Sequence, residues 1–372
     1  MLVADWHLWI GEYWCLDQHA WIGVLLVVLG SKFQREEFLA VLGSALFSLC
    51  LDRSYSYRAW IGVSDGIERA PCLDRSFKEE FGIERDDDTI KRLYEIPSTS
   101  AVPDHNDSTP VITKDVTLNP NHNTWVRIFL PLQALDNTST NNSVGNTKLP
   151  LIAYYHGGGF ILLSANSTVN HDFCFNMALQ LSVVVVFVEY YLDPEHCLPA
   201  TYDDAVETLH WIKCTQEKLL RDFAGYSKCF LMGTSVGGNI AYHVGLRAST
   251  AVGDFEPLKI KGLILHHPFF GLILHQPFFG GTQRTESELR LVNDPVLPLF
   301  VNDLMWELSL PIGVDRDHEY CNPAVDGGSQ RLEKIRLLEW RVLVIDCKGD
   351  PLIDRQIELV KMMEEKGLVV AS

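Results

Sequence analysis

The sequence predicts an α/β fold with a mainly parallel sheet that is covered by helices on both faces. From residue 149 onward, near-continuous runs of Val, Ile and Leu alternate with helical segments, as in parallel sheets buried on both faces. Hydrophobic residues make up 47% of the chain and charged residues 21%, which is typical of globular proteins. The 372 residues are enough for two domains, or for one large α/β domain with an appendage.

Each element of this fold is predicted from a local pattern. Short apolar runs predict strands at 149–155, 183–191, 228–233, 260–266 and 340–347. Apolar residues at helical spacing predict helices at 198–219, 237–249 and 353–367, the last of which ends at Gly367. Upstream, residues 89–150 are expected to be rich in strands, with a loop over the polar tract Asp136–Thr147.

The N-terminal segment, residues 1–86, is left without a domain assignment, and residues 87–372 are expected to form the α/β domain. The segment contains five of the nine Trp residues and no catalytic motif. Its apolar run Trp21–Gly30 is shorter than the ~20 residues that span a bilayer. No Lys or Arg precedes Lys32, so the positively charged start of a signal peptide is missing. We therefore expect a cytoplasmic protein rather than a membrane protein.

Charge and cysteine content exclude several classes of partner. The net charge of −17 repels phosphate backbones, so binding to nucleic acid is not expected. The nine Cys are scattered without a C-x-x-C pair, which indicates free thiols and neither a disulfide framework nor a zinc site. We expect no metal and no cofactor, and the sequence leaves the oligomeric state open.

The first chemical motif is G-x-S-x-G at residues 233–237, between a predicted strand and a predicted helix. This is the context of a nucleophile elbow, in which a tight turn exposes a serine above the sheet. Ser235 is then the candidate nucleophile. The amide of Val236 begins the helix and is positioned to stabilise a developing oxyanion.

The second motif, HGGGF, occupies residues 156–160 directly after a predicted strand. Consecutive glycines allow backbone N–H groups to approach a substrate closely. Gly157, Gly158 and Gly159 are therefore candidates for the rest of an oxyanion hole, and the hydroxyl of Ser235 is expected to face them. A plain glycine-rich turn is the alternative, and His156 is expected to brace this loop rather than act as a base.

The third motif is GDPLID at residues 349–354, just after the predicted strand at 340–347. A carboxylate on a loop at the carboxyl end of a strand suits the acid of a catalytic triad, which orients a histidine. Asp350 is the candidate, and it is expected to approach the same cleft as Ser235. The compatible alternative is that Asp350 caps the following helix.

These three motifs, together with VEYYLDPEHCLPATYDDA at 188–205, resemble the plant carboxylesterase family. That family belongs to the hormone-sensitive-lipase-like group of α/β-hydrolases and includes the gibberellin receptors as non-hydrolytic relatives. The resemblance covers about residues 89–371. It implies an α/β-hydrolase fold, Ser235 as nucleophile, Asp350 as acid, and an oxyanion hole at residues 157–159 and Val236. The implied substrate is a carboxylic ester of a small molecule.

The sequence also departs from the family pattern. The family's triad histidine follows the acid, but no His follows Asp350 in these 372 residues. The chain is therefore expected to be C-terminally truncated, missing its last strand and helix, with impaired esterase activity. The other histidines are expected to be poor substitutes. A non-catalytic receptor of the gibberellin type and a non-functional remnant remain as alternatives.

Substitutions and a repeat mark further departures. Tyr191, Asp193 and Cys197 stand where the family usually has Arg, Ala and Arg. GLILHHPFF at 262–270 is followed at once by GLILHQPFF at 271–279, which we interpret as a local tandem duplication. Only one copy can fill a core strand, so the other is expected to lie outside the sheet and to promote aggregation.

Overall fold

The computed structural model describes most of the chain beyond residue 82. The described residues are 83–86, 89–93, 95–103, 109–120, 124–136, 148–260, 264–265, 267–268, 272–325, 328–345 and 349–372. The predictions made for residues 1–82, and most of the predicted loop Asp136–Thr147, lie outside these residues.

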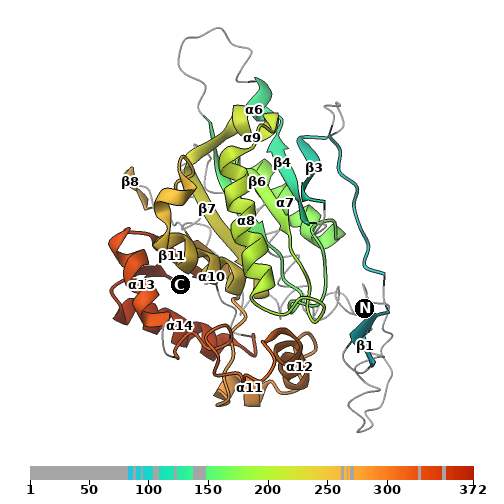
Figure 1. The fold of residues 1–372 in the computed structure, drawn as a ribbon, viewed down its shortest axis with the longest axis vertical. Helices are drawn as coiled ribbons and strands as arrows, with labels where there is room; N and C mark the ends of the chain where they lie inside the picture. The colour runs from blue at the N-terminus through green and yellow to red at the C-terminus, as the bar shows by residue number, and fades with distance from the viewer. Residues whose placement is uncertain are drawn as a thin grey trace, which may run out of the picture.

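The centre of the structure is an eight-stranded sheet with strand order β12-β11-β10-β7-β5-β6-β4-β3 (Figure 1). Six neighbouring strands of this sheet run parallel to one another: β6, β5, β7, β10, β11 and β12. Strand β4 is antiparallel to both of its neighbours, β6 and β3. Their bounds are β3 Val111–Asn119, β4 Thr124–Pro131, β5 Leu149–Tyr155, β6 Val184–Glu189, β7 Ala224–Thr234, β10 Leu272–His275, β11 Arg341–Ile345 and β12 Val369–Ala371. A separate hairpin joins β1 (Ile83–Asp86) to β2 (Thr89–Arg92).

Helices follow most of the parallel strands. Their bounds are α6 Gln133–Asp136, α7 Thr168–Leu181, α8 Ala200–Cys214, α9 Lys218–Phe223, α10 Val236–Thr250, η1 Val252–Phe255, α11 Glu286–Arg290, α12 Leu299–Ser309, α13 Gly328–Leu337 and α14 Ile353–Glu365. In Figure 1, α8 lies in front of the strands, and α11, α12 and α14 gather below the sheet. The predicted helices at 198–219, 237–249 and 353–367 correspond to α8 with α9, α10 and α14.

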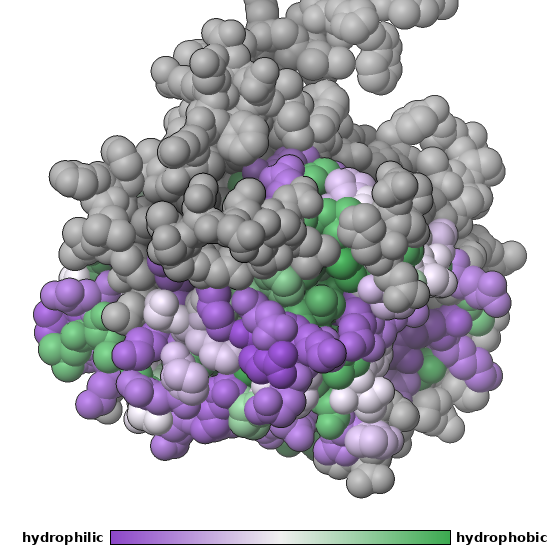
Figure 2. Space-filling view, turned by 90° about the horizontal axis from the view of Figure 1, so that it is seen from above, coloured by the Kyte–Doolittle hydropathy of each residue, from purple (hydrophilic) through white to green (hydrophobic). Residues whose placement is uncertain are grey.

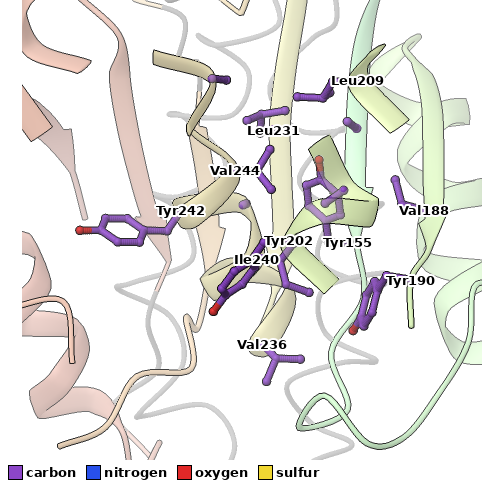
Figure 3. Packing of buried hydrophobic residues seen from close by; sticks show 14 of the residues in the cluster. Tyr155, Val188, Tyr190, Tyr202, Leu209, Leu231, Val236, Ile240, Tyr242 and Val244 are labelled. Carbon is purple, nitrogen blue, oxygen red and sulfur yellow. The ribbon is translucent and has the colours of Figure 1, made fainter. Parts of the chain in front are cut away.

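Strand β5 shows that both faces of the sheet are covered, as the sequence predicts. Ile152 and Tyr154 belong to a hydrophobic cluster with α7, whereas Leu151, Ala153 and Tyr155 belong to a larger cluster with α8 and α10. Successive strand residues point to opposite faces, so a run of buried residues requires layers on both sides. Figure 3 shows side chains of β5, β7, α8 and α10 converging in the larger cluster.

The second copy of the repeat, and not the first, supplies the sheet strand. Residues 272–275 form β10, which pairs in parallel with both β7 and β11. The first copy contributes β8 (Ile264–Leu265) and β9 (His267–Pro268), which pair only with each other. The prediction of a sheet strand at 260–266 is therefore wrong, because the later copy is the one continuous with the buried segment Pro277–Gly281. The expectation that one copy lies outside the main sheet is confirmed for the backbone.

The described surface seen from above in Figure 2 is mainly hydrophilic, with hydrophobic residues gathered near the middle of this face. Within the described ranges, no helix combines the length and apolarity that a membrane span requires.

Candidate active site

Ser235 lies at a sharp corner between a strand and a helix. Strand β7 ends at Thr234 and α10 begins at Val236. The backbone of Ser235 has φ 56° and ψ −119°, a conformation that costs a non-glycine residue about 1–3 kcal/mol. Its carbonyl oxygen accepts hydrogen bonds from the N–H groups of Gly238 (2.9 Å) and Phe278 (3.0 Å). The surrounding structure therefore holds a strained turn in place, as the elbow motif predicts.

The glycine loop packs directly against this corner because β5, which precedes the loop, is the sheet neighbour of β7. A Cβ atom built on Gly157 would lie 3.2 Å from the Thr234 carbonyl oxygen and 3.3 Å from Cβ of Ser235. Any side chain at position 157 would crowd the serine. The next two residues, Gly158 (φ 111°) and Gly159 (φ 64°), turn the chain away through left-handed conformations. The structure thus brings Gly157 and Ser235 together.

Val236 occupies the first position of α10 and is buried. The first four N–H groups of an α-helix have no partner within the helix, so this end of α10 offers hydrogen-bond donors beside Ser235. The positive end of the helix dipole lies at the same place and favours negative charge there. The backbone of the elbow therefore has the chemistry that an oxyanion hole needs.

Asp350 lies at the same edge of the sheet as Ser235. It follows β11, and β11, β10 and β7 are adjacent parallel strands whose carboxyl ends meet at one edge. Asp350 is 2% exposed, and its Oδ1 accepts a hydrogen bond of 2.8 Å from the N–H of Leu352. Its Oδ2 accepts a longer one, 3.4 Å, from Nε2 of Gln356. The N-cap of α14 is Leu352, two residues after Asp350, and the Asp350 carboxylate holds the turn that leads into this helix through the Leu352 N–H.

Helix α11 supports the loop that carries Asp350, and sequence reasoning missed this contact. The hydroxyl of Ser287 donates to the carbonyl oxygen of Pro351 (2.8 Å), the residue next to Asp350. The N–H of Ser287 donates in turn to Oδ2 of Asp354 (2.7 Å). Residue 287 is more than 60 positions from the loop in sequence, so no local pattern signals the contact.

A buried ion pair reinforces the same junction. Arg355 and Glu288 are 9% and 1% exposed, and both oxygens of the carboxylate lie 3.2 Å from guanidinium nitrogens. Arg355 also donates to the carbonyl oxygen of Gln283. Glu288 completes a capping box with Thr285 at the start of α11. The charges of Arg355 and Glu288 therefore link α11 to α14 beside the acid loop.

His156 braces the glycine loop, as the sequence predicts. Its ring is fully buried and stacks on Tyr190 with a centroid distance of 4.2 Å. Nδ1 lies 2.6 Å from the Gly157 carbonyl oxygen, an acceptor, so the proton is placed on Nδ1. Burial lowers the pKa of His156 to about 4, so the ring is neutral at physiological pH.

Behind the glycine loop, Asp193 is a buried carboxyl group. It is fully buried, with the Ser309 hydroxyl beside its carboxyl group. Its backbone N–H donates to the Phe160 carbonyl oxygen (3.0 Å), and Arg92 donates to its carbonyl oxygen (2.9 Å). Burial raises the pKa of Asp193 to about 8, Ser309 and Arg92 oppose the rise, and Glu195 adds to it. The departure from Ala at this position thus places a carboxyl group where burial favours its protonated form.

Asn239, two residues after the G-x-S-x-G motif, ties the elbow to its surroundings. Its Nδ2 donates to the carbonyl oxygens of Phe278 (3.1 Å) and Tyr320 (2.8 Å). Its Oδ1 accepts a hydrogen bond of 2.7 Å from the hydroxyl of Tyr202. The side chain therefore joins α10, α8 and the segment that follows β10.

Other histidines with described side chains have structural surroundings of their own. His243 is buried in α10 and stacks on Tyr202, and burial lowers its pKa to about 3. His318 accepts a hydrogen bond from the N–H of Tyr320. The side chains of His266, His267 and His275 lie outside the described residues.

No group of three or more His, Cys, Asp or Glu side chains suited to a metal ion occurs among the described residues. The Cys residues found free in those parts of the chain are Cys174, Cys197, Cys214, Cys229 and Cys321.

A mainly parallel sheet with a strained strand-to-helix corner at its carboxyl edge defines the α/β-hydrolase class. A family model described as alpha/beta hydrolase fold matches residues 152–372, more than half of the chain. Solved structures agree on the fold. An esterase of the archaeon Pyrobaculum calidifontis superposes with a TM-score of 0.54 and 23% identity, over 71% of this chain and 74% of that one.

Relatives of known name narrow the class. Carboxylesterase 20 of Arabidopsis thaliana is 49% identical over 76% of this chain and 83% of its own length. The 3-O-acetylpapaveroxine carboxylesterase CXE2 of Papaver somniferum is 48% identical over 77% and 86%. Gibberellin receptor GID1B of Arabidopsis thaliana is 33% identical over 67% and 66%. The chain therefore belongs to the plant carboxylesterase family of α/β-hydrolases, and by that membership it is a carboxylic ester hydrolase.

Proposed function

We propose that the chain hydrolyses carboxylic esters of small molecules through Ser235. The observation that carries this proposal is the strained backbone of Ser235, held at φ 56° between β7 and α10 with Gly157 packed against it. Strain of this kind persists only where the surrounding structure enforces it, and it clusters at functional sites.

The proposed reaction follows the acyl-enzyme route. The Ser235 hydroxyl oxygen attacks the ester carbonyl carbon, and the carbonyl oxygen becomes an oxyanion that accepts hydrogen bonds from the amides of Gly158, Gly159 and Val236. The tetrahedral intermediate collapses and the alcohol leaves with a proton. Water then hydrolyses the acyl group from Ser235. Asp350 is the proposed triad acid.

The proton of Ser235 needs a base, and no His follows Asp350 within the 372 residues. We propose that this 372-residue chain on its own is slow, since loss of one triad member leaves only ~10³–10⁴-fold catalysis over water. Substrate binding and the oxyanion hole would supply that remaining activity.

The proposed substrate is an O-acetyl ester, because the name of a relative with 48% identity specifies such a group. A neutral or cationic alcohol portion suits the net charge of −17, which disfavours the approach of anions. A cytoplasmic location suits the cysteines that are free in the described parts of the chain, because thiols stay reduced in that compartment.

The test compares the purified chain with Ser235→Ala, using p-nitrophenyl acetate hydrolysis and labelling by a fluorophosphonate. We expect slow turnover, well below the ~10 s⁻¹ of a median enzyme, and equally slow labelling that mass spectrometry locates on Ser235. The variant should lose both signals. Equal rates for the two proteins would refute the nucleophile assignment, whereas wild-type turnover near ~10 s⁻¹ would refute the proposed impairment.

A small-molecule receptor is the second candidate, supported by the 33% identity with gibberellin receptor GID1B. Calorimetric titration with a gibberellin separates it from the esterase. Tight binding without turnover, unchanged in Ser235→Ala, would favour the receptor, and absence of binding would remove this candidate.

A further inference from the structure

The tandem repeat offers two nearly identical segments for one place in the sheet. With the glycine that follows each copy, residues 262–271 read GLILHHPFFG and residues 271–280 read GLILHQPFFG. The two stretches differ only at His267 and Gln276. Gly271 belongs to both, because it ends one stretch and begins the other.

In the structure, the second copy makes a defined set of contacts. Ile273 pairs with Met232 of β7 on one side and with Leu343 of β11 on the other. Further along, the Phe278 ring stacks on Trp306 with a centroid distance of 4.9 Å. The backbone N–H of Phe278 also donates a hydrogen bond to the backbone carbonyl oxygen of Ser235. This copy therefore joins the sheet to the elbow.

The first copy carries the same residue type at each of these positions. Ile264 corresponds to Ile273, and Phe269 corresponds to Phe278. Gly271 corresponds to Gly280, where an added Cβ would lie 2.8 Å from Sγ of Cys321. We propose that the two copies compete for the same place between β7 and β11, so that the chain has two native registers nine residues apart.

The location of the displaced residues decides which register dominates. With the second copy in the sheet, the spare residues come before β10, where β8 and β9 pair outside the main sheet. With the first copy in the sheet, the spare residues come after the buried position that Gly280 now holds beside Cys321. An insertion at this buried position would disturb the packing around it, so the register with the second copy in the sheet is the major form.

The exchange changes one side chain beside the elbow. Position 276 follows His275, which pairs with Thr234, the residue before the candidate nucleophile. Its N–H donates to the carbonyl oxygen of Ile345 (2.6 Å), at the end of β11. In the minor register His267 takes this position in place of Gln276.

An aspartate scan of the full chain tests the exchange. Ile273→Asp places a charge in a strand whose register neighbours Met232 and Leu343 are buried. If the first copy substitutes, this variant keeps a cooperative thermal transition, with a Tm only a few degrees below wild type. Ile264→Asp should melt like wild type. The double variant should have no cooperative transition, because neither copy is then suited to the sheet.

Leu343→Asp is the matched control, since β11 has no second copy. It should lose cooperative folding as the double variant does. Hydrogen–deuterium exchange then locates the strand, because His267 and Gln276 give peptides of the two copies different masses. Protection should cover 272–275 in the wild type and 263–266 in Ile273→Asp.

Two outcomes would overturn the proposal. One is an Ile273→Asp chain that unfolds like the double variant. The other is an Ile273→Asp chain that folds but keeps its protection at 272–275. Neither measurement depends on esterase activity, so this test is independent of the proposed function.

Discussion

The two halves of the carboxyl edge of the sheet are built in different ways. Around Ser235, position is set by the backbone, through the strained turn and the close approach of Gly157 from the neighbouring strand β5. Around Asp350, position is set by side chains, above all Ser287 and the Glu288–Arg355 pair. The elbow is held by local contacts that its motif encodes, whereas the GDPLID motif around Asp350 gives no sign of the distant side chains that hold its loop.

The largest expected effect comes from breaking the acid half at its ion pair. Arg355→Met leaves the Glu288 carboxylate buried without its partner, and such a change costs about 3–5 kcal/mol of unfolding free energy. Urea denaturation measures the loss. Adding Glu288→Leu should restore part of it. For comparison, Arg221→Met breaks an exposed pair with Asp222 and should change stability by less than ~1 kcal/mol. A similar small loss for Arg355→Met would show that the pair does not anchor α14.

A smaller but clear effect is expected from the nucleophile half. A Cβ at Gly237 would collide with the backbone carbonyl of Tyr155, so Gly237→Ala should cost about 1–3 kcal/mol and reduce phosphonate labelling of Ser235. Gly253→Ala is the control, because no atom lies within 4 Å of the added Cβ. It should stay within ~0.5 kcal/mol of wild type. Equal stability of the two variants would contradict the tight packing of the elbow.

The stability of the folded chain should depend on pH through Asp193, which lies behind the glycine loop. Its pKa is raised to about 8 in the folded chain, against ~3.9 when unfolded. The folded state therefore binds more protons between these values, and its stability falls as pH rises from about 4 to about 8. Asp193→Asn removes this dependence. The Tm of the variant relative to wild type should rise between pH 5 and pH 9, and a constant difference would show that Asp193 is already ionised.

The smallest expected effect is the difference in Tm between two deletion variants, which should be close to zero. Deleting residues 262–270 or residues 271–279 leaves two chains that differ only by Gln or His at one position. Both should have higher soluble yield than the full chain, because either deletion removes a spare uncharged, strand-prone segment. Their Tm values should agree closely. Soluble yield and Tm equal to those of the full chain would show that the spare copy carries no cost.

The sequence is sufficient to predict the layered sheet, because apolar runs and helical spacing are local signals. Both the elbow and the glycine loop are also predicted, since each needs particular residues at adjacent positions. The choice between the two copies could not be predicted, because it depends on contacts of Gly280 with Cys321 far along the chain. Ser287 was missed for the same reason. The sequence marks Asp193 only as a departure from the family's usual Ala, because its burial depends on packing between Phe160 and α12.

The detour between Ile260 and Leu272 has a practical consequence for protein engineering. Of the residues between them, the described strands β8 and β9 pair outside the main sheet, while β10 keeps regular pairing with β7 and β11. Lengthening a connection adds little entropy cost, about 0.6 kcal/mol for each doubling. This junction is therefore a suitable insertion point for an epitope or a fluorescent reporter, at the opposite edge of the sheet from Ser235 and Asp350.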